Sequence, residues 1–316
     1  MSAPTLTPGQ LRWARTQLRL RSMREFGRKF VRRRDGVVGA LILLIFAVLA
    51  IAPALFVGPL ETATTASGYA LEPPSGTHVL GTDRLGRDML NLTVHGTRVS
   101  MFIGLLATVI TILIGVIVGI TSGYLGGRWD ALLMRITDFF LVIPTFVLAI
   151  ILAPIALEMI GADAEIFGIR ATLLVIVVVI GATTWASTAR IIRSQTLSVK
   201  ERMFVDRARV IGGRGAHIMW RHILPNVVNL IVANTVLTFA GAVFTETTLS
   251  FIGLGDPFQP SWGQLLNAAQ EAGAPGLGAW WYIVPPAACV VTVILAFTLV
   301  GNALDDVLNP KAMVRR

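Results

Sequence analysis

Residues 101–121 read M-F-I-G-L-L-A-T-V-I-T-I-L-I-G-V-I-V-G-I-T, a run of 21 residues without one charged side chain. A helix of about 20 predominantly apolar residues is long enough to cross the hydrocarbon core of a bilayer. The composition of the chain agrees, because 54% of its 316 residues are hydrophobic and only 14% are charged. Soluble domains average about 25% charged residues. The run therefore predicts a membrane-spanning helix.

Five further apolar runs lie along the chain, and together they predict an all-α, polytopic membrane protein with six transmembrane helices. The fourth run is short, so we expect it to take in residues 166–169, with Arg170 reaching toward the headgroups. The first run is of full span length and lacks a clear cleavage site, which favours an anchored helix over a signal peptide. The predicted spans are 36–56, 101–121, 136–157, 171–186, 227–250 and 282–304.

The basic residues predict the orientation of these spans. The formal net charge is +9, which on a soluble protein would suggest a nucleic-acid partner. With a cytoplasmic N-terminus, however, 23 of the 27 Lys and Arg residues fall on cytoplasmic segments. This is the asymmetry that sets membrane topology. We therefore expect both termini in the cytoplasm, and no nucleic acid as a partner.

The spans divide the chain into three parts. Residues 1–35 form a basic cytoplasmic segment that is expected to lie on the bilayer surface. Residues 36–310 form the transmembrane domain, with an external loop at about 57–100 and a cytoplasmic loop at about 187–226. That cytoplasmic loop predicts two short helices around a turn at Gly212 and Gly213. Residues 311–316 are a cytoplasmic tail.

The motifs of several enzyme classes are missing from this chain. No lysine follows a glycine, so there is no phosphate-binding loop, and neither His-Glu-x-x-His nor Gly-x-Ser-x-Gly occurs. Its single cysteine, Cys289, matches no metal-ligand spacing. The sequence therefore nominates no catalytic residue, no metal ligand and no cofactor for this chain.

Few ionisable groups fall within the predicted spans. Asp138 follows Arg135 by three residues, so the two share a helix face and are expected to form an ion pair. Glu246 lies near the external end of the fifth span, where it faces protein or water, with lining a substrate path as the alternative. A proton-driven carrier usually shows more such groups. An external energy source is therefore favoured.

The cytoplasmic loop reads F-V-D-R-A-R-V-I-G-G-R-G-A-H-I-M-W-R-H-I-L-P-N over 204–226. It resembles the coupling loop of ABC importer permeases, whose pattern is Glu-Ala-Ala, three residues, Gly, and a spacer ending in Ile-x-Leu-Pro. Asp and Arg replace the first two residues of that pattern, and His replaces the Ile. The resemblance implies contact with an ATPase subunit through Asp206, Arg207, Ala208, Gly212, Gly213, His222, Leu224 and Pro225.

Other motifs resemble the dipeptide and oligopeptide (DppC/OppC-like) branch of that family. They include G-T-D-R-L-G-R-D at 81–88, L-S-F-I-G-L-G at 249–255, P-S-W-G at 260–263 and G-N-A-L-D-D-V-L-N-P at 301–310. In the first of these motifs, the charged residues either form internal salt bridges that shape the loop or contact a solute-binding protein. The residues of that external motif are Gly81, Thr82, Asp83, Gly86, Arg87 and Asp88.

The resemblance implies a type I ABC importer permease fold in a bacterial cytoplasmic membrane and a peptide as cargo. The implied partners are a second homologous permease, two cytoplasmic ATPases that bind ATP and Mg²⁺, and an external solute-binding protein. Two alternatives stay open. The same machine could import nickel or another small solute, or the chain could be a secondary transporter that needs no ATPase.

The predicted topology can be tested with single cysteines and a thiol reagent that cannot cross the membrane. Cysteines near Thr65 and Gly273 should react in intact cells, because both positions are predicted to be external. A cysteine near Gly213 should react only after the membrane is opened. The reverse pattern would contradict the orientation.

Overall fold

The computed structural model describes residues 24–25, 27–161, 164–166 and 168–308. Most of the basic N-terminal segment and the tail at 311–316 therefore lie outside the described residues. Within them, five helices are long and apolar enough to cross a membrane, and one bent helix pair makes a sixth span. The prediction of a helical protein with six spans is thus confirmed, with one two-stranded hairpin, β1 (Glu165–Ile166) and β2 (Ile169–Arg170), as the exception.

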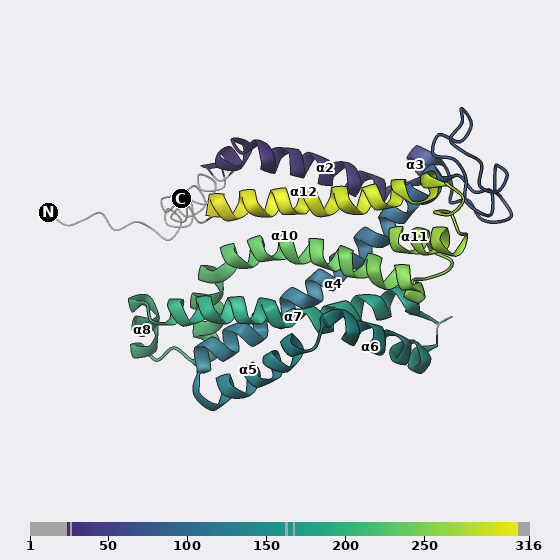
Figure 1. The fold of residues 1–316 in the computed structure, drawn as a ribbon. Helices are drawn as coiled ribbons and strands as arrows, with labels where there is room; N and C mark the ends of the chain where they lie inside the picture. Colours follow the sequence, from purple (N-terminus) through teal and green to yellow (C-terminus); the bar gives the residue numbers. More distant parts are fainter. Residues whose placement is uncertain (1–23, 26, 162–163, 167, 309–316) are drawn as a thin grey trace.

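The helices run back and forth between two ends of the molecule (Figure 1). At one end, Arg33 pairs with Asp306, so the start of the first span and the end of the last lie together. We call this the loop end, because α8 lies there too (Figure 1). At the other end, the motif end, Trp281 Nε1 donates to the carbonyl of Thr82 at 3.2 Å. The spanning elements are α2 (Arg34–Ile51), α4 (Met89–Leu125), α5 (Gly127–Val142), α6 (Thr145–Ile160), α7 (Ala171–Lys200), α10 (Leu224–Leu249) and α12 (Val284–Leu308).

Short elements close the two ends. At the loop end are α8 (Met203–Val210), α9 (Gly215–Ile218) and a π-helical turn (Met219–Ile223) that leads into α10. At the motif end are α3 (Ala54–Val57), a π-helical turn (Ser250–Leu254), α11 (Trp262–Glu271) and a 3₁₀ turn (Trp280–Tyr282).

Helices α4 and α7 form the centre of the fold, and three glycines let them approach closely. A Cβ atom at Gly119 would lie 2.6 Å from the carbonyl oxygen of Ala189. A Cβ at Gly115 would likewise lie 2.6 Å from the side chain of Thr188, and a Cβ at Gly123 would lie 2.8 Å from the side chain of Thr196. Lipid tails are as apolar as Leu side chains, so spans associate through such close packing and not through burial of apolar surface.

The second and fourth spans are longer than predicted. Helix α4 begins at Met89, because Asp88 caps its first turn by accepting a hydrogen bond from Leu90 N at 2.9 Å. The predicted external loop therefore ends near residue 88, not 100. Helix α7 begins at Ala171 as expected but continues through the polar residues 187–200. The prediction that it borrows residues from 166–169 is wrong, because Ile166 and Ile169 pair in the hairpin strands and the helix begins at Ala171.

The third span is not one straight helix. It is broken between α5 and α6, whose axes differ by 91°. Proline lacks an N–H donor and disfavours helical backbone in the residue before it. Pro144 stands at the break, and Ile143 before it has extended backbone angles, φ −78° and ψ 127°. The bend therefore has a local cause in the sequence.

Helix α11 fixes the motif end to the spans. The side chain of Trp262 is fully buried; its Nε1 donates to the Thr93 carbonyl at 3.1 Å, and its backbone N donates to Ser100 Oγ at 3.2 Å. Its ring also meets Phe46 of α2 edge to face. One tryptophan thus joins α2, α4 and α11.

Valine in place of Gly119 should destabilise the protein, because the new side chain meets backbone that can yield only if α4 and α7 separate. Overpacking of this kind costs about 1–3 kcal/mol. The matched control is Gly241→Val on α10, where a Cβ meets nothing within 4 Å. We expect a lower thermal midpoint in detergent for Gly119→Val alone, and equal midpoints would contradict the packing.

Candidate functional site

Helix α8 is held rigidly against the spans by one face. Val205 and Ala208 are buried in a cluster with Ile120 of α4 and Ile192 of α7. Arg209 places its guanidinium 5.5 Å from the centre of the Tyr124 ring, at the end of α4. Any force applied to α8 is therefore passed directly to α4 and α7.

The other face of α8 presents apolar side chains to the surroundings. Met203, Val210 and Ile211 are 75%, 87% and 85% exposed. Met203 also lines an open pocket of about 490 Å³, together with Glu201, Arg202, Phe204 and Arg207. Exposed apolar side chains gathered beside polar ones mark surfaces that bind other proteins.

The turn after α8 needs glycine at two positions, for different reasons. Gly212 has φ +84°, a left-handed conformation that costs other residues roughly 1–2 kcal/mol. Gly213 donates its N–H to the Ala208 carbonyl at 2.9 Å, and a Cβ there would lie 2.6 Å from that same oxygen. The prediction of two short helices around a glycine turn is confirmed.

The structure separates the predicted coupling residues into surface and interior positions. Asp206 and Arg207 are exposed, with Asp206 paired to Arg209 at 3.1 Å, whereas Ala208 faces the interior and packs within this chain. His222 is half-buried beside His217, with ring centres 5.7 Å apart. Leu224 and Pro225 open α10, where a proline is tolerated because first-turn N–H groups have no helical partner.

The motif at 81–88 is built around one buried carboxylate. Asp83 is fully buried and accepts hydrogen bonds from the backbone N–H groups of Leu85 and Arg87 at 2.8 and 2.9 Å. The guanidinium of Arg87 binds the other carboxylate oxygen of Asp83 through Nε and Nη2, at 2.8 and 2.6 Å. The reading that internal salt bridges shape this loop thus has a direct geometric basis.

The remaining motif residues hold this loop close to the neighbouring segment that contains Gly68 and Tyr69. Thr82 is buried, and its hydroxyl donates to the Tyr69 carbonyl at 2.6 Å. Gly81 and Gly86 both have positive φ, and a Cβ at Gly86 would lie 2.2 Å from the Gly68 carbonyl.

Burial of Asp88, which starts α4, raises the pKa of its carboxyl above the usual value. Burial, with the charge of Asp83 nearby, raises the pKa of Tyr282 to about 12.

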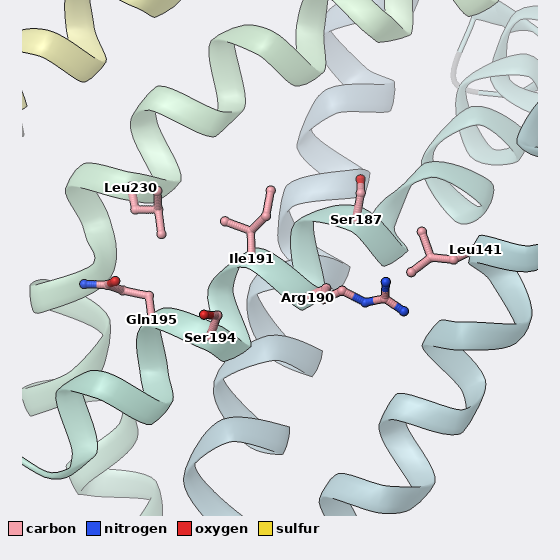
Figure 2. Close-up of a pocket in the computed structure, with 7 residues that line it drawn as sticks. All are labelled: Leu141, Ser187, Arg190, Ile191, Ser194, Gln195 and Leu230. Atoms are coloured by element: carbon pink, nitrogen blue, oxygen red, sulfur yellow. The ribbon is translucent and has the colours of Figure 1, made fainter. Parts of the chain in front are cut away.

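A groove runs along α7 between α5 and α10. Its loop-end pocket, about 530 Å³, is shown in Figure 2, where the Arg190 side chain extends from α7 toward Leu141 of α5. A middle pocket of about 300 Å³ adjoins it and shares Leu141 and Ser187. The loop-end pocket is lined by Leu141, Ser187, Arg190, Ile191, Ser194, Gln195 and Leu230; the middle pocket adds five threonines, Thr145, Thr183, Thr184, Thr238 and Thr245, among others.

The polar side chains of this groove lie on one side of α7, where Ser187, Arg190 and Ser194 are exposed. Polar side chains within spans face protein or water-filled cavities because lipid solvates them poorly. A further pocket of about 600 Å³ near the starts of α4 and α7 is lined by His95, Arg98 and Gln259, among others. The groove is therefore a described face suited to a polar solute, and it continues along α7 into the middle pocket.

Asp138 has a different partner from the one that the sequence predicted. Asp138 pairs with Arg190 Nη2 at 2.6 Å, so the predicted pair with Arg135 is wrong. The helix spacing indicated a local partner, but α7 brings a guanidinium from 52 residues away. Arg135 lies exposed on α5.

Glu246 is fully buried at the motif end and does not line either pocket of the groove. Its carboxylate accepts a hydrogen bond from Ser250 Oγ at 2.8 Å, and the hydroxyls of Ser100 and Ser261 also reach it. Glu246 thus joins α10, α4 and the start of α11. Among the residues that the structure describes, no group of three or more His, Cys, Asp or Glu side chains is arranged to hold a metal ion.

Alanine at Asp83 should destabilise the protein by about 3 kcal/mol, because it leaves the guanidinium of Arg87 half-buried without its carboxylate. The control is Arg84→Ala, which removes an exposed pair with Glu271 and should change little. Thermal midpoints and protease cleavage of the 57–88 loop would measure both. Equal effects of the two changes would contradict a structural role for the buried pair.

Comparisons with known proteins agree with this architecture. Residues 112–314 match the family model described as "Binding-protein-dependent transport system inner membrane component". The oligopeptide transport system permease protein OppC of Bacillus subtilis is 34% identical over 285 residues, covering 90% of this chain and 88% of the relative. The dipeptide transport system permease protein DppC of Bacillus subtilis is also 34% identical, with 90% and 84% covered, and OppC of Haemophilus influenzae is 34% identical, with 93% and 91% covered. The resemblance drawn from the motifs is thus confirmed, and the chain belongs to the family of binding-protein-dependent transport system inner membrane components.

Proposed function

We propose that this chain is a permease subunit of an ATP-driven ABC importer that moves dipeptides or oligopeptides across the bacterial cytoplasmic membrane. The relatives that it matches over about 90% of its length are named as dipeptide and oligopeptide permeases, which supports a peptide over nickel or another small solute. The observation that carries the proposal is the exposed apolar face of α8, whose opposite face is fixed to α4 and α7.

In this proposal the loop end is cytoplasmic, and both termini lie there. The α8 face, with Met203, Val210 and Ile211 at its surface, docks on a cytoplasmic ATPase subunit. Two such ATPases bind ATP and Mg²⁺, and this chain contributes no nucleotide site. A second homologous permease completes the path along the groove, and an external solute-binding protein delivers the peptide at the motif end.

Coupling follows from the rigid attachment of α8. When the ATPases close on ATP, they move α8, and its buried contacts pass this movement to α4 and α7. Helix α7 forms one wall of the groove, so its rotation changes the side to which the groove opens. A secondary transporter would have no use for such a docking surface, and the absence of ionisable residues from the middle pocket also counts against it.

Cysteine at Ile211 should cross-link to the ATPase subunit, because this side chain is exposed at the centre of the proposed contact. Gly213 is a poorer site, since a Cβ there meets the Ala208 carbonyl. The control is Tyr69→Cys, which is exposed at the motif end and should not cross-link. Failure at Ile211, Val210 and Met203 together would reject this docking surface.

Valine at Gly212 should lower the ATP hydrolysis that is stimulated by loaded binding protein, because it strains the turn that orients α8. Gly58→Val is the matched control: Gly58 also has positive φ and open surroundings but lies at the motif end. Assembly should survive both changes. Stimulated hydrolysis that is equal in the two variants would contradict the role of the turn.

A further inference from the structure

Two arginine–aspartate pairs join α5 to α7, Arg190–Asp138 and Arg193–Asp130. The arginines are about one turn apart on α7 and the aspartates about two turns apart on α5, and the two pairs differ in exposure and in hydrogen bonding. Arg193 binds Asp130 through both Nε and Nη2, each at 2.6 Å, and Ser122 Oγ also bonds to that carboxylate. These side chains are 29% and 19% exposed. This pair therefore already fastens the two helices together.

The second pair, Arg190 with Asp138, is more exposed and makes fewer hydrogen bonds. Arg190 and Asp138 are 58% and 54% exposed, and they meet through one nitrogen and one oxygen, Nη2 and Oδ1, at 2.6 Å. A guanidinium carries five N–H donors in a planar fork. The bond to Asp138 uses one of the two N–H groups of Nη2, so the other Nη2 donor and the donors of Nε and Nη1 stay available. At this position α7 also turns Ser187 and Ser194 outward.

The available donors of Arg190 lie in the groove. Arg190 is the charged residue among those lining the loop-end pocket, and Ser187, Ser194 and Gln195 supply uncharged donors and acceptors beside it (Figure 2). Asp138 is not part of this lining; it binds the guanidinium from α5. Arg190 lies 19 residues beyond the start of α7, about 28 Å along the helix axis. That depth corresponds to the cytoplasmic end of the path.

We propose that Arg190 binds a free carboxylate of the peptide as it leaves the groove, and that Asp138 is the residue that positions the guanidinium. This inference rests on the proposed function. Planar guanidinium donors match a carboxylate in a bidentate arrangement, which a lysine ammonium cannot reproduce. The neighbouring serines and Gln195 can bond the peptide backbone without reading its side chains.

Asp138 partly neutralises the charge of Arg190, which suits a site that a peptide must also leave. An unpaired guanidinium would hold an anion more tightly, and conduction requires binding strong enough to admit a ligand but weak enough to release it. Asp138 lowers the net charge of the site to zero while it leaves the remaining donors of Arg190 available. The pair therefore attracts a carboxylate locally without retaining it.

The test uses the whole complex in vesicles, with this chain, its partner permease and both ATPases, and with peptide-loaded binding protein. The measured quantities are labelled peptide moved and ATP hydrolysed. Arg190→Gln should lower the peptide moved per ATP about tenfold while stimulated hydrolysis stays near that of the wild type. Arg190→Lys, which keeps the charge, should recover only part of this loss. Arg193→Gln, the matched control, should lower thermal stability instead, because its pair fastens α5 to α7.

A charge swap separates ligand binding from structure. Arg190→Asp combined with Asp138→Arg restores an ion pair between α5 and α7 but moves the cation out of its place in the pocket. We expect the swapped complex to assemble and hydrolyse ATP, yet to move as little peptide as Arg190→Gln. Recovery of transport by the swap would overturn the proposal, since a purely structural pair would tolerate it.

Three further outcomes would also overturn it. They are wild-type transport by Arg190→Gln, loss of the partner permease from the Arg190→Gln complex, and an effect of this change only in vesicles with anionic lipid. The second would make Arg190 an interface residue, and the third would make it a lipid contact. If the proposed function itself is wrong, the wild-type complex will show no ATP-dependent peptide uptake. That result is distinct from every outcome that concerns Arg190 alone.

Discussion

The close packing of α4 on α7 is the constraint on which the rest of the structure depends. Gly115, Gly119 and Gly123 remove the side chains that would hold the two helices apart, and the backbone of α7 fills the space. Both functional ends are attached to this pair: α8 packs on its loop end, and Trp262 binds the motif end of α4. Because the pair is incompressible, movement at one end is transmitted to the other as a rigid-body displacement.

The groove lies beside the break in the third span. Pro144 follows the end of α5, which meets α7 through ion pairs near the loop end, and α6 leaves at 91° to α5 and packs its buried Ala149 and Ala153 against α7. The polar side of α7 is left open, next to the threonines of α10. Several of these hydroxyls donate to carbonyls of their own helices, as Thr183 does to Val179 at 2.8 Å and Thr238 to Asn234 at 2.8 Å. A hydroxyl whose hydrogen is donated in this way still offers its oxygen as a weak acceptor. Weak acceptors suit a path for peptides of different sequence, because they do not select one side chain.

The sequence predicted the number of spans, the glycine turn between α8 and α9, and the family, because these depend on local composition and short motifs. The lengths of α4 and α7 were missed because their polar ends, such as residues 89–100 and 187–200, lower the hydropathy while still forming helix against neighbouring protein. The break at Pro144 could have been predicted, because the residue before a proline disfavours helical backbone. The close approach at glycines 115, 119 and 123 could have been predicted from their four-residue spacing, which is typical of helix contacts in membranes. The pair of Arg190 with Asp138 had none, since it is formed only when α7 packs beside α5.

If this chain acts within a binding-protein-dependent peptide importer, its partners should accompany it from the native membrane. Gentle purification of the chain, followed by mass spectrometry of the accompanying proteins and of any small molecule on the binding protein, would test this. We expect a second permease, ATPase subunits and a peptide-loaded binding protein. Reproducible purification of the chain alone, under conditions that keep a known importer intact, would contradict it.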